Sequence, residues 1–178
     1  MKTYKDRASL IEDTISGDDV VLDVGFWGQA VGIDNPEWVH NVLRRSAKEV
    51  YGVDITYDDS ALSNPEHYQR ASAESFHFDT TFDVIFASEL IEHLTNPGLF
   101  LEQCKKHLTS SGALILTTPN TFGFMTLIQK MFKKEPSVNP DHTMYFNKTV
   151  LETLLNKCGF TITKCAYIAT FQIGRAHV

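Results

Sequence analysis

The chain has 178 residues, of which 43% are hydrophobic and 21% are charged. This composition is typical of a globular protein with one domain, and it excludes a disordered, collagen-like or coiled-coil chain. Asp and Glu together number 22, against 16 for Lys and Arg, which gives a net charge of −6. A protein that binds nucleic acid in general is usually basic, so the charge disfavours that class.

The cysteine count and the apolar pattern indicate the cellular compartment of the protein. The three cysteines, Cys104, Cys158 and Cys165, form no CxxC pair, so the sequence predicts neither a disulfide framework nor a zinc site. The first residues do not open the apolar segment of a signal peptide, and no run of about 18 apolar residues predicts a membrane span. We therefore expect a cytoplasmic protein, with its oligomeric state left open.

Short apolar strands alternate with helical patterns along the chain. The expected strands are residues 20–24, 50–54, 68–71, 82–87, 112–117 and 160–171. The expected helices are residues 7–16, 35–47, 97–108, 122–134 and 147–157. This alternation predicts an α/β fold with an open, mostly parallel sheet and helices on both faces. In such sheets the ligand binds beyond the carboxyl ends of the strands, so the residues that follow each strand are the candidate site.

The end of the first expected strand carries a glycine turn. Asp23 lies in this strand and Gly25 follows it, where a glycine lets the chain turn tightly and lets a ligand approach the backbone. The second strand ends at Asp54, whose carboxylate can accept both hydroxyls of a ribose. Together these features predict a nucleoside site. The alternative is a plain packing turn beside a solvated aspartate.

The glycine spacing separates two classes of nucleoside-binding protein. The glycines after the first strand are Gly25, Gly28 and Gly32. They do not reproduce the GxGxxG pattern of a dinucleotide site, which disfavours a nicotinamide-dependent enzyme. The segment Leu22-Asp23-Val24-Gly25 instead resembles the first motif of the class I S-adenosylmethionine-dependent methyltransferases. Trp27 and Gln29 stand where that family usually has its second and third glycines, and we expect Gly28 to take over part of their role.

Later segments extend the resemblance over residues 18–171. Residues 82–85 and the following Ser88-Glu89-Leu90-Ile91-Glu92-His93-Leu94 resemble the fourth strand and the motif after it in small-molecule methyltransferases. Residues 71–74 resemble the segment that lines the adenine, and residues 141–146 resemble the loop on the acceptor side. The resemblance implies a Rossmann-like sheet, S-adenosyl-L-methionine as the cofactor and a small-molecule acceptor.

The resemblance also implies which residues hold the cofactor. The loop at Gly25 would hold the methionine moiety through its backbone, Asp23 would orient the methionine ammonium, and Asp54 would hold the ribose. Phe26 and Ile55 would help to enclose the adenosine. The expected cofactor-binding residues are Asp23, Gly25, Phe26, Gly28, Asp54, Ile55, Ser72, Ala73, Ser88 and Glu89.

Two histidines are candidates for a catalytic base, because histidine titrates near neutral pH. His93 follows the fourth strand, and His142 lies in the acceptor-side loop. The alternatives are that His93 only caps a helix or packs beside the cofactor, and that His142 only bonds the loop backbone. Glu92 and His93 have no further ligand at a suitable spacing, so we expect no metal site. The histidines expected on the surface are His40, His67, His77 and His107.

The end of the chain departs from the family pattern. Residues 173–178 fit no element and resemble one translation frame of a common sequencing adapter. We therefore expect a methyltransferase domain at residues 1–172 and a non-native tail after it; the alternative is an ordinary polar tail. The family's sheet usually ends in two antiparallel strands, and only residues 160–171 remain for them. We expect a C-terminally truncated sheet that lacks its last antiparallel strand and exposes an edge.

The leading hypothesis is a methyltransferase that moves the sulfonium methyl group of its cofactor in line to an acceptor atom about 3 Å away. Oxygen is the preferred acceptor atom. Residues 122–139 carry apolar side chains at helical spacing and are expected to form a lid over the acceptor, with core packing and a membrane-facing role as alternatives. Two other functions stay open: a methyltransferase-like binding module with weak or no activity, and an NAD-dependent oxidoreductase.

Overall fold

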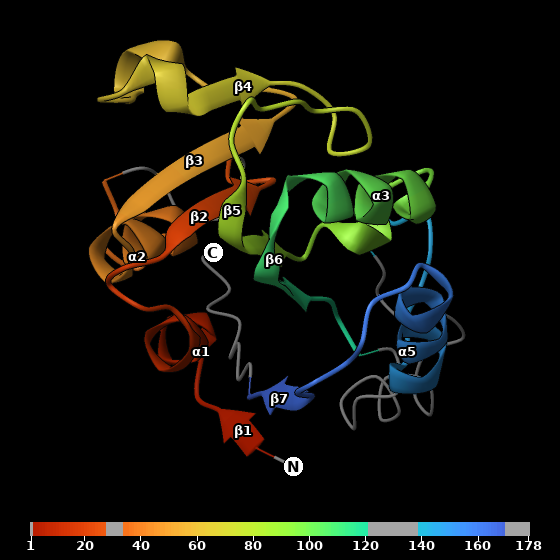
Figure 1. Ribbon diagram of the computed structural model, residues 1–178. Helices are drawn as coiled ribbons and strands as arrows, with labels where there is room; N and C mark the ends of the chain where they lie inside the picture. The colour runs from red at the N-terminus through yellow and green to blue at the C-terminus, as the bar shows by residue number, and fades with distance from the viewer. Residues whose placement is uncertain (1, 28–33, 121–138, 170–178) are drawn as a thin grey trace, which may run out of the picture.

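The computed structural model describes residues 2–27, 34–120 and 139–169 (Figure 1). The role of Gly28, the helix at residues 122–134 and the nature of residues 173–178 lie outside these ranges. The strands are β1 (Lys2–Tyr4), β2 (Val20–Val24), β3 (Glu49–Asp54), β4 (Tyr68–Arg70), β5 (Phe82–Ser88), β6 (Leu108–Thr117) and β7 (Ala166–Ile168). The helices are α1 (Arg7–Thr14), α2 (Val39–Ser46), α3 (Pro97–His107) and α5 (Lys148–Lys157), with short 3-10 helices η1 (Asp59–Ala61), η2 (Pro65–His67) and η3 (Ile91–His93).

Five strands form the central sheet in the order β4-β3-β2-β5-β6, and every neighbouring pair is parallel. From β2 the chain builds the sheet outward through β3 and β4, and then returns to the other side of β2 with β5 and β6. The strand order therefore reverses between β2 and β5. Open α/β sheets bind their ligands at such a reversal, beyond the carboxyl ends of the strands. The predicted Rossmann-like, parallel α/β fold is confirmed.

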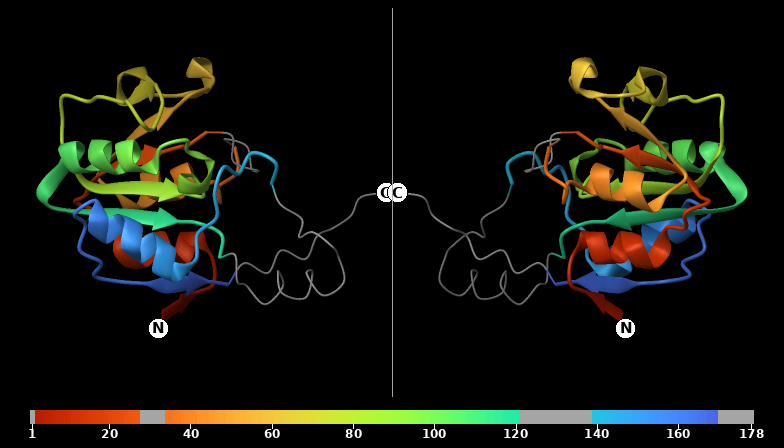
Figure 2. Two further views of the ribbon diagram at one scale, coloured as in Figure 1. Left: turned by 90° about the vertical axis from the view of Figure 1, so that its right-hand side faces the viewer. Right: turned by 90° about the vertical axis from the view of Figure 1, so that its left-hand side faces the viewer.

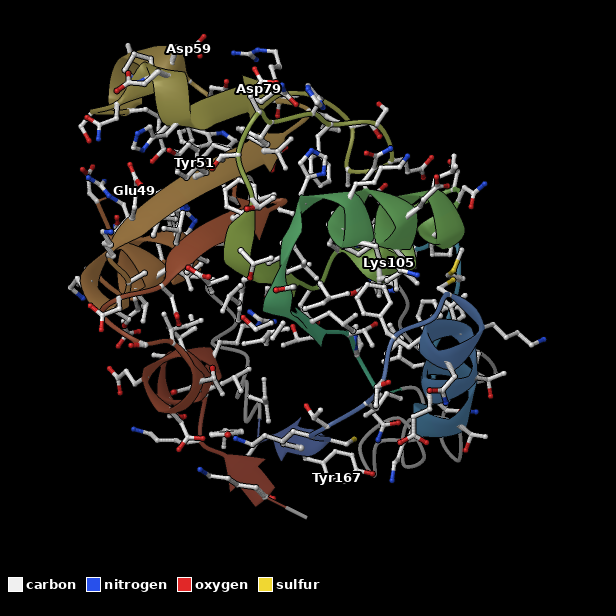
Figure 3. The ribbon with its side chains drawn as sticks, viewed as in Figure 1. Glu49, Tyr51, Asp59, Asp79, Lys105 and Tyr167 are labelled. Atoms are coloured by element: carbon white, nitrogen blue, oxygen red, sulfur yellow. The ribbon has the colours of Figure 1, made fainter. Side chains whose placement is uncertain are left out.

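Helices cover both faces of this sheet (Figures 1 and 2). Alternate residues of β2 serve the two sides: Val21 packs in a buried cluster with α1 and α2, whereas Leu22 packs in a cluster with α3 and α5. Lys105 of α3, labelled in Figure 3, donates from Nζ to the carbonyl of Cys158 just after α5 (3.2 Å). In the described part of the chain, no helix has both the length and the apolar character that a membrane crossing needs.

Asparagine side chains begin two helices as the sequence predicts, but not the third. Asn96 and Asn147 accept hydrogen bonds from backbone N–H groups three residues later, at 3.2 and 2.9 Å, and so begin α3 and α5. The helix predicted over residues 35–47 does not begin at Asn35. Oδ1 of Asn35 instead accepts from the N–H of Glu37 (2.8 Å) within a turn, so α2 begins later, at Val39.

The last strand is shorter than predicted and belongs to a different sheet. β7 pairs in parallel with β1, and this two-stranded sheet lies at the bottom of the views in Figure 2. Asp13 of α1 accepts from Lys2 (2.6 Å) and from Lys164 (2.9 Å), and these contacts link α1 both to β1 and to the segment just before β7. The prediction that residues 160–171 supply an antiparallel strand of the main sheet is therefore wrong for residues 160–169. Among the described strands β6 forms an edge of the main sheet, and none of its residues is fully buried.

Candidate cofactor and acceptor site

The turn after β2 is built around Gly25. Its φ of +74° lies in the left-handed region, which side chains rarely tolerate, and its N–H donates to the carbonyl of Val53 (2.8 Å). A Cβ atom at this position would lie 3.0 Å from Cδ1 of Leu90. The side chain of Leu90, which lies two residues after the end of β5, therefore packs closely against the glycine. The turn needs glycine both for its backbone angle and for this close approach.

Asp54, at the end of β3, ties this turn to the neighbouring strand. Its Oδ2 accepts from the backbone N–H of Trp27 (2.9 Å), and its Oδ1 accepts from the N–H of Thr56 (3.2 Å). Burial raises the pKa of the Asp54 carboxyl, although these N–H groups oppose the shift. The residue expected to bind ribose therefore lies directly beside the turn expected to bind methionine. The next residue, Ile55, is 67% exposed.

Asp23 lies beneath the turn in a buried chain of hydrogen bonds. Its Oδ2 is 2.9 Å from Nδ1 of His40, and Nε2 of His40 is 2.9 Å from the hydroxyl of Tyr68. Burial raises the pKa of the Asp23 carboxyl, and the hydrogen bond from His40 opposes the shift. The other oxygen, Oδ1, has no hydrogen-bond partner among the described residues. The prediction that His40 lies on the surface is wrong, because a buried carboxylate needs a partner and α2 supplies it.

Aromatic rings support the turn from the protein interior. Phe26 is 0% exposed, and Nε1 of Trp38 donates to its carbonyl (3.1 Å). The rings that pack near the Phe26 ring are those of Trp27, Trp38, His40, Tyr57 and Tyr68. The Phe26 ring therefore lies in the core, and its contact with the cofactor, which stays a prediction, would go through its backbone.

The segment after β4 turns at Ser72, whose Oγ accepts from the N–H of Glu74 (3.1 Å). The carboxylate of Glu74 accepts from the N–H of Thr95 (2.9 Å), which fastens this segment to the loop before α3. Ala73 between them is 8% exposed. Because β4 pairs with β3, the segment lies at the same end of the sheet as Asp54, where the adenine prediction requires it.

The end of β5 carries an unusual backbone angle. Glu89 has a φ of 52°, and among the described residues it is the one residue other than glycine with a positive φ. Its N–H donates to the carbonyl of Thr117 (3.0 Å), and its Oε1 accepts from Oγ1 of the same residue (3.0 Å). Ser88 is 6% exposed, with its Oγ 3.2 Å from that hydroxyl. A guanidinium nitrogen of Arg7 lies 3.5 Å from Oε2 of Glu89, so β6 and α1 both hold this side chain.

Three side chains that can bind a metal ion meet beside η3. One ligand atom from each of Glu92, His93 and His142 lies within 4.8 Å of the others. The rings of His93 and His142 meet edge to face, with centroids 4.6 Å apart. Burial lowers the pKa of His142, and the neighbouring His93 adds to the shift, so the imidazole of His142 favours its neutral form. The structure thus brings the two predicted catalytic histidines together.

Glu92 was not predicted as part of the site. Its side chain is 1% exposed, and its Oε2 accepts from Oγ1 of Thr118 (3.0 Å), while Oε1 has no hydrogen-bond partner among the described residues. The inference that Glu92 and His93 lack a further ligand is wrong, because folding brings His142 to them. A hydrogen bond across 51 residues, from Oγ1 of Thr143 to the carbonyl of Glu92, holds this contact, and sequence spacing could not reveal it.

His40 and His107 were missed as buried residues for different reasons. His40 lies on the buried face of α2, beside Val39 and Leu43, so its place within an apolar stripe was the signal that could have revealed it. His107 ends α3 at 4% exposure, where its Nε2 accepts from the N–H of Phe78 (3.1 Å). By contrast, His77 has a side chain that is 76% exposed, as predicted.

The fold and the site together define a class of protein. A parallel sheet with a glycine turn and an acid at the ends of two adjacent strands is the arrangement by which Rossmann-like proteins bind nucleosides. The model of the methyltransferase domain family matches residues 19–164. The chain belongs to the S-adenosylmethionine-dependent methyltransferases, whose cofactor is S-adenosylmethionine.

Individual relatives agree with this family. A Mycobacterium tuberculosis protein named as an S-adenosylmethionine-dependent methyltransferase is 30% identical over 147 residues, 79% of this chain and 48% of that protein. A ubiquinone biosynthesis O-methyltransferase of Haemophilus ducreyi is 28% identical over 114 residues, 56% of this chain and 45% of that protein. A crystal structure from Bacillus halodurans, assigned to the methyltransferases, has a TM-score of 0.63 at 22% identity, covering 87% of this chain and 68% of that one. The chain spans about half the length of the curated relatives it matches.

Proposed function

We propose that this protein transfers a methyl group from S-adenosylmethionine to a small-molecule acceptor, with oxygen as the preferred acceptor atom. The observation that carries the proposal is the contact between the Gly25 turn and Asp54, at the end of the sheet where the strand order reverses. This arrangement suits a nucleoside whose other end is charged. The name of the Haemophilus ducreyi relative, an O-methyltransferase, supports oxygen as the acceptor atom.

The proposed cofactor position spans the ends of β2 and β3. The backbone at Gly25 would hold the methionine carboxylate, and Oδ1 of Asp23, which lacks a partner among the residues described, would attract the methionine ammonium. Asp54 would accept the ribose hydroxyls, since each of its oxygens still has acceptor capacity beside one backbone N–H. The other proposed cofactor contacts are Phe26, Gly28, Ile55, Ser72, Ala73, Ser88 and Glu89.

The proposed acceptor position lies on the β5 side of the site. His93 and His142 are the catalytic residues of the proposal, because either neutral imidazole can take the proton from an acceptor hydroxyl. The oxygen then forms a bond to the methyl carbon, the carbon–sulfur bond breaks, and its electron pair returns to sulfur. The products are a methyl ether, a neutral thioether and a protonated imidazole.

Titration calorimetry with S-adenosylmethionine tests the cofactor assignment, with NADH as the comparison ligand. We expect one S-adenosylmethionine bound per chain and no heat from NADH. Failure to bind S-adenosylmethionine would contradict the proposal, and binding of NADH would favour an oxidoreductase. Incubation with S-adenosylmethionine carrying a deuterated methyl group, together with phenol, catechol and amine acceptors, then tests transfer by mass spectrometry. Labelled amines without labelled ethers would contradict the oxygen preference, and no labelled product from any acceptor would favour the binding module.

We also propose that residues 1–172 form the domain and that residues 173–178 are a non-native tail. Deletion of residues 173–178 should change neither the thermal midpoint nor the affinity for S-adenosylmethionine, and a clear loss of either would assign them to the domain. The compartment proposed is the reducing cytoplasm, because the thiols of Cys104, Cys158 and Cys165 are all free.

A further inference from the structure

The proposed methyl transfer gives no role to the buried carboxylate of Glu92. Its carboxylate is almost completely buried, and only one of its oxygens has a hydrogen-bond partner within the described residues. An unpaired oxygen of a buried carboxylate is unfavourable, because the group has given up water without a replacement. A bound cation satisfies such an oxygen directly, and His93 and His142 each place a ligand atom within 4.8 Å of an oxygen of this carboxylate.

The imidazole of His93 is held as metal-binding histidines usually are. Its Nδ1 lies 3.2 Å from the carbonyl of Asp141, which can only accept, so Nδ1 carries the proton. The lone pair of the neutral ring is therefore on Nε2. A backbone carbonyl that fixes the tautomer and the ring orientation in this way is a recurrent partner of histidine ligands.

Backbone contacts fix the third side chain beside the first two. The N–H of Thr143 donates to the carbonyl of Glu92 (2.9 Å), and Oγ1 of Thr143 lies 2.6 Å from the carbonyl of Leu94. The residue before Thr143 is His142, so these bonds hold the loop that carries His142 against η3. The backbone contacts therefore hold the loop that carries His142 beside Glu92 and His93, as a preformed ion site requires.

We propose that Glu92, His93 and His142 bind one divalent transition-metal ion, such as Zn²⁺ or Mn²⁺. Two imidazoles and one carboxylate are a known ligand set for catalytic metal ions, which keep an open position for a water molecule or a substrate. Resting on the proposed function, we assign that open position to the acceptor oxygen. A metal-bound hydroxyl loses its proton to solvent more readily, and its oxygen is then held ready to attack the methyl carbon. While the ion is bound, the two histidines serve as its ligands, and solvent takes the acceptor proton that an imidazole takes in the metal-free protein.

Metal binding can be tested on the whole chain without any acceptor. After chelator treatment and dialysis, Zn²⁺ and Mn²⁺ are titrated by calorimetry, and Co²⁺ is added as a probe whose visible absorption reports coordination. We expect one ion per chain, and we expect E92Q and H142A each to lower the affinity by at least about 100-fold. The matched control is H77A, because His77 also lies beside a carboxylate, that of Asp79 (labelled in Figure 3), but is exposed. Its affinity for the ion should not change.

The outcomes separate this proposal from the proposed function. Chelated protein that binds S-adenosylmethionine but no metal would overturn the metal site and leave the methyltransferase standing, with the histidines as base candidates. Protein that binds metal but not S-adenosylmethionine would overturn the proposed methyltransferase function and leave the metal site standing. An equal loss of affinity in H77A would also overturn the proposal, because it would show binding to surface histidines. Circular dichroism checks that each variant folds, and H93Q is the replacement if E92Q does not.

Discussion

The candidate site has two halves: the cofactor half, at the ends of β2 and β3, and the acceptor half, at the end of β5 and in η3. The two halves have similar features but differ in how many of their polar groups find partners within the described part of the protein. Each half has a residue with positive φ after its strand, Gly25 at +74° after β2 and Glu89 at 52° after β5. Each half also has a buried carboxylate with one oxygen, on Asp23 and on Glu92, that has no hydrogen-bond partner in the described parts of the chain. In the first half a glycine takes the left-handed angle without strain, and His40 pairs with the carboxylate. In the second half a glutamate takes that angle.

The difference teaches which half depends more on a ligand. The side chains of Asp23 and Asp54 mostly find partners within the described residues, through hydrogen bonds of about 2.9 Å, so folding alone orders these two carboxylates. The acceptor half keeps an unfavourable backbone angle at Glu89 and two neighbouring imidazoles. Proteins retain such local conflicts mainly at functional sites, where binding offsets them.

The largest loss of stability is expected for His40→Ala, which removes the partner of Asp23. A buried charge left without its partner costs about 3–5 kcal/mol, so the free energy of unfolding should fall by that amount. Urea denaturation followed by circular dichroism measures it. The control His77→Ala, at an exposed site, should change stability by less than about 0.5 kcal/mol. A loss in His40→Ala no larger than the control would show that the pair does not order this half.

Asp54→Asn tests the cofactor half by ligand binding. Hydrogen bonds to a charged group contribute about 1.5–3 kcal/mol, so the affinity for S-adenosylmethionine should fall about 10- to 100-fold in calorimetry. Asp79→Asn, which changes a fully exposed carboxylate, is the control. Unchanged affinity in Asp54→Asn would show that the ribose assignment is wrong.

The same Asp54→Asn variant should respond to pH in a defined direction. Burial raises the pKa of Asp54, so the folded protein holds this proton more tightly than the unfolded chain does. Ionisation of Asp54 therefore lowers stability as the pH rises from the unfolded value of about 3.9 through the raised folded value. Asparagine removes that loss, so the variant should gain in relative stability above this window and not below it. Thermal melts without cofactor between pH 3.5 and 7.5, referred to wild type, measure the gain; a relative loss at high pH would contradict the assigned cause.

Gly25→Ala should disturb the turn itself. A left-handed backbone with a Cβ costs about 1–2 kcal/mol, and the new methyl group would lie 3.0 Å from Leu90. We expect a loss of stability of this size and weaker binding of S-adenosylmethionine. Gly17→Ala is the matched control, because a Cβ there meets no atom within 4 Å. Equal effects at the two positions would contradict the special role of Gly25.

Glu89→Gly has the smallest expected effect on stability. It tests the backbone angle in the acceptor half, as Gly25→Ala tests it in the cofactor half. Glycine relieves the left-handed strain but adds entropy to the unfolded chain, so stability should change by less than about 1 kcal/mol. Methyl transfer should nevertheless fall, because the substitution removes the side chain of a proposed cofactor contact. Full activity with unchanged stability would show that the glutamate has no role there.

Much of the fold follows from local patterns. The strands at β2, β3 and β5 were predicted because buried parallel strands are continuous apolar runs. The helix α3 was predicted because Asn96 and Pro97 stand at its start, and α5 because Cys158 and Gly159 end it. β1 was missed and β7 was assigned to the wrong sheet, since their pairing is made through the backbones of segments that lie far apart in the sequence. The candidate cofactor residues were predictable to the same degree, because they directly follow predicted strands.

By itself the sequence determined a parallel α/β sheet, a glycine turn after the first long strand and an acid after the second. Hydrophobic period, helix caps and glycine spacing are local properties, and a single chain displays them directly. Only the tertiary structure decided that His40 pairs with Asp23, across 17 residues, and that the loop at His142 reaches Glu92, across about 51. Such contacts depend on where the helix and the loop pack against the sheet. That packing is fixed by the whole core and leaves no fixed spacing in the sequence.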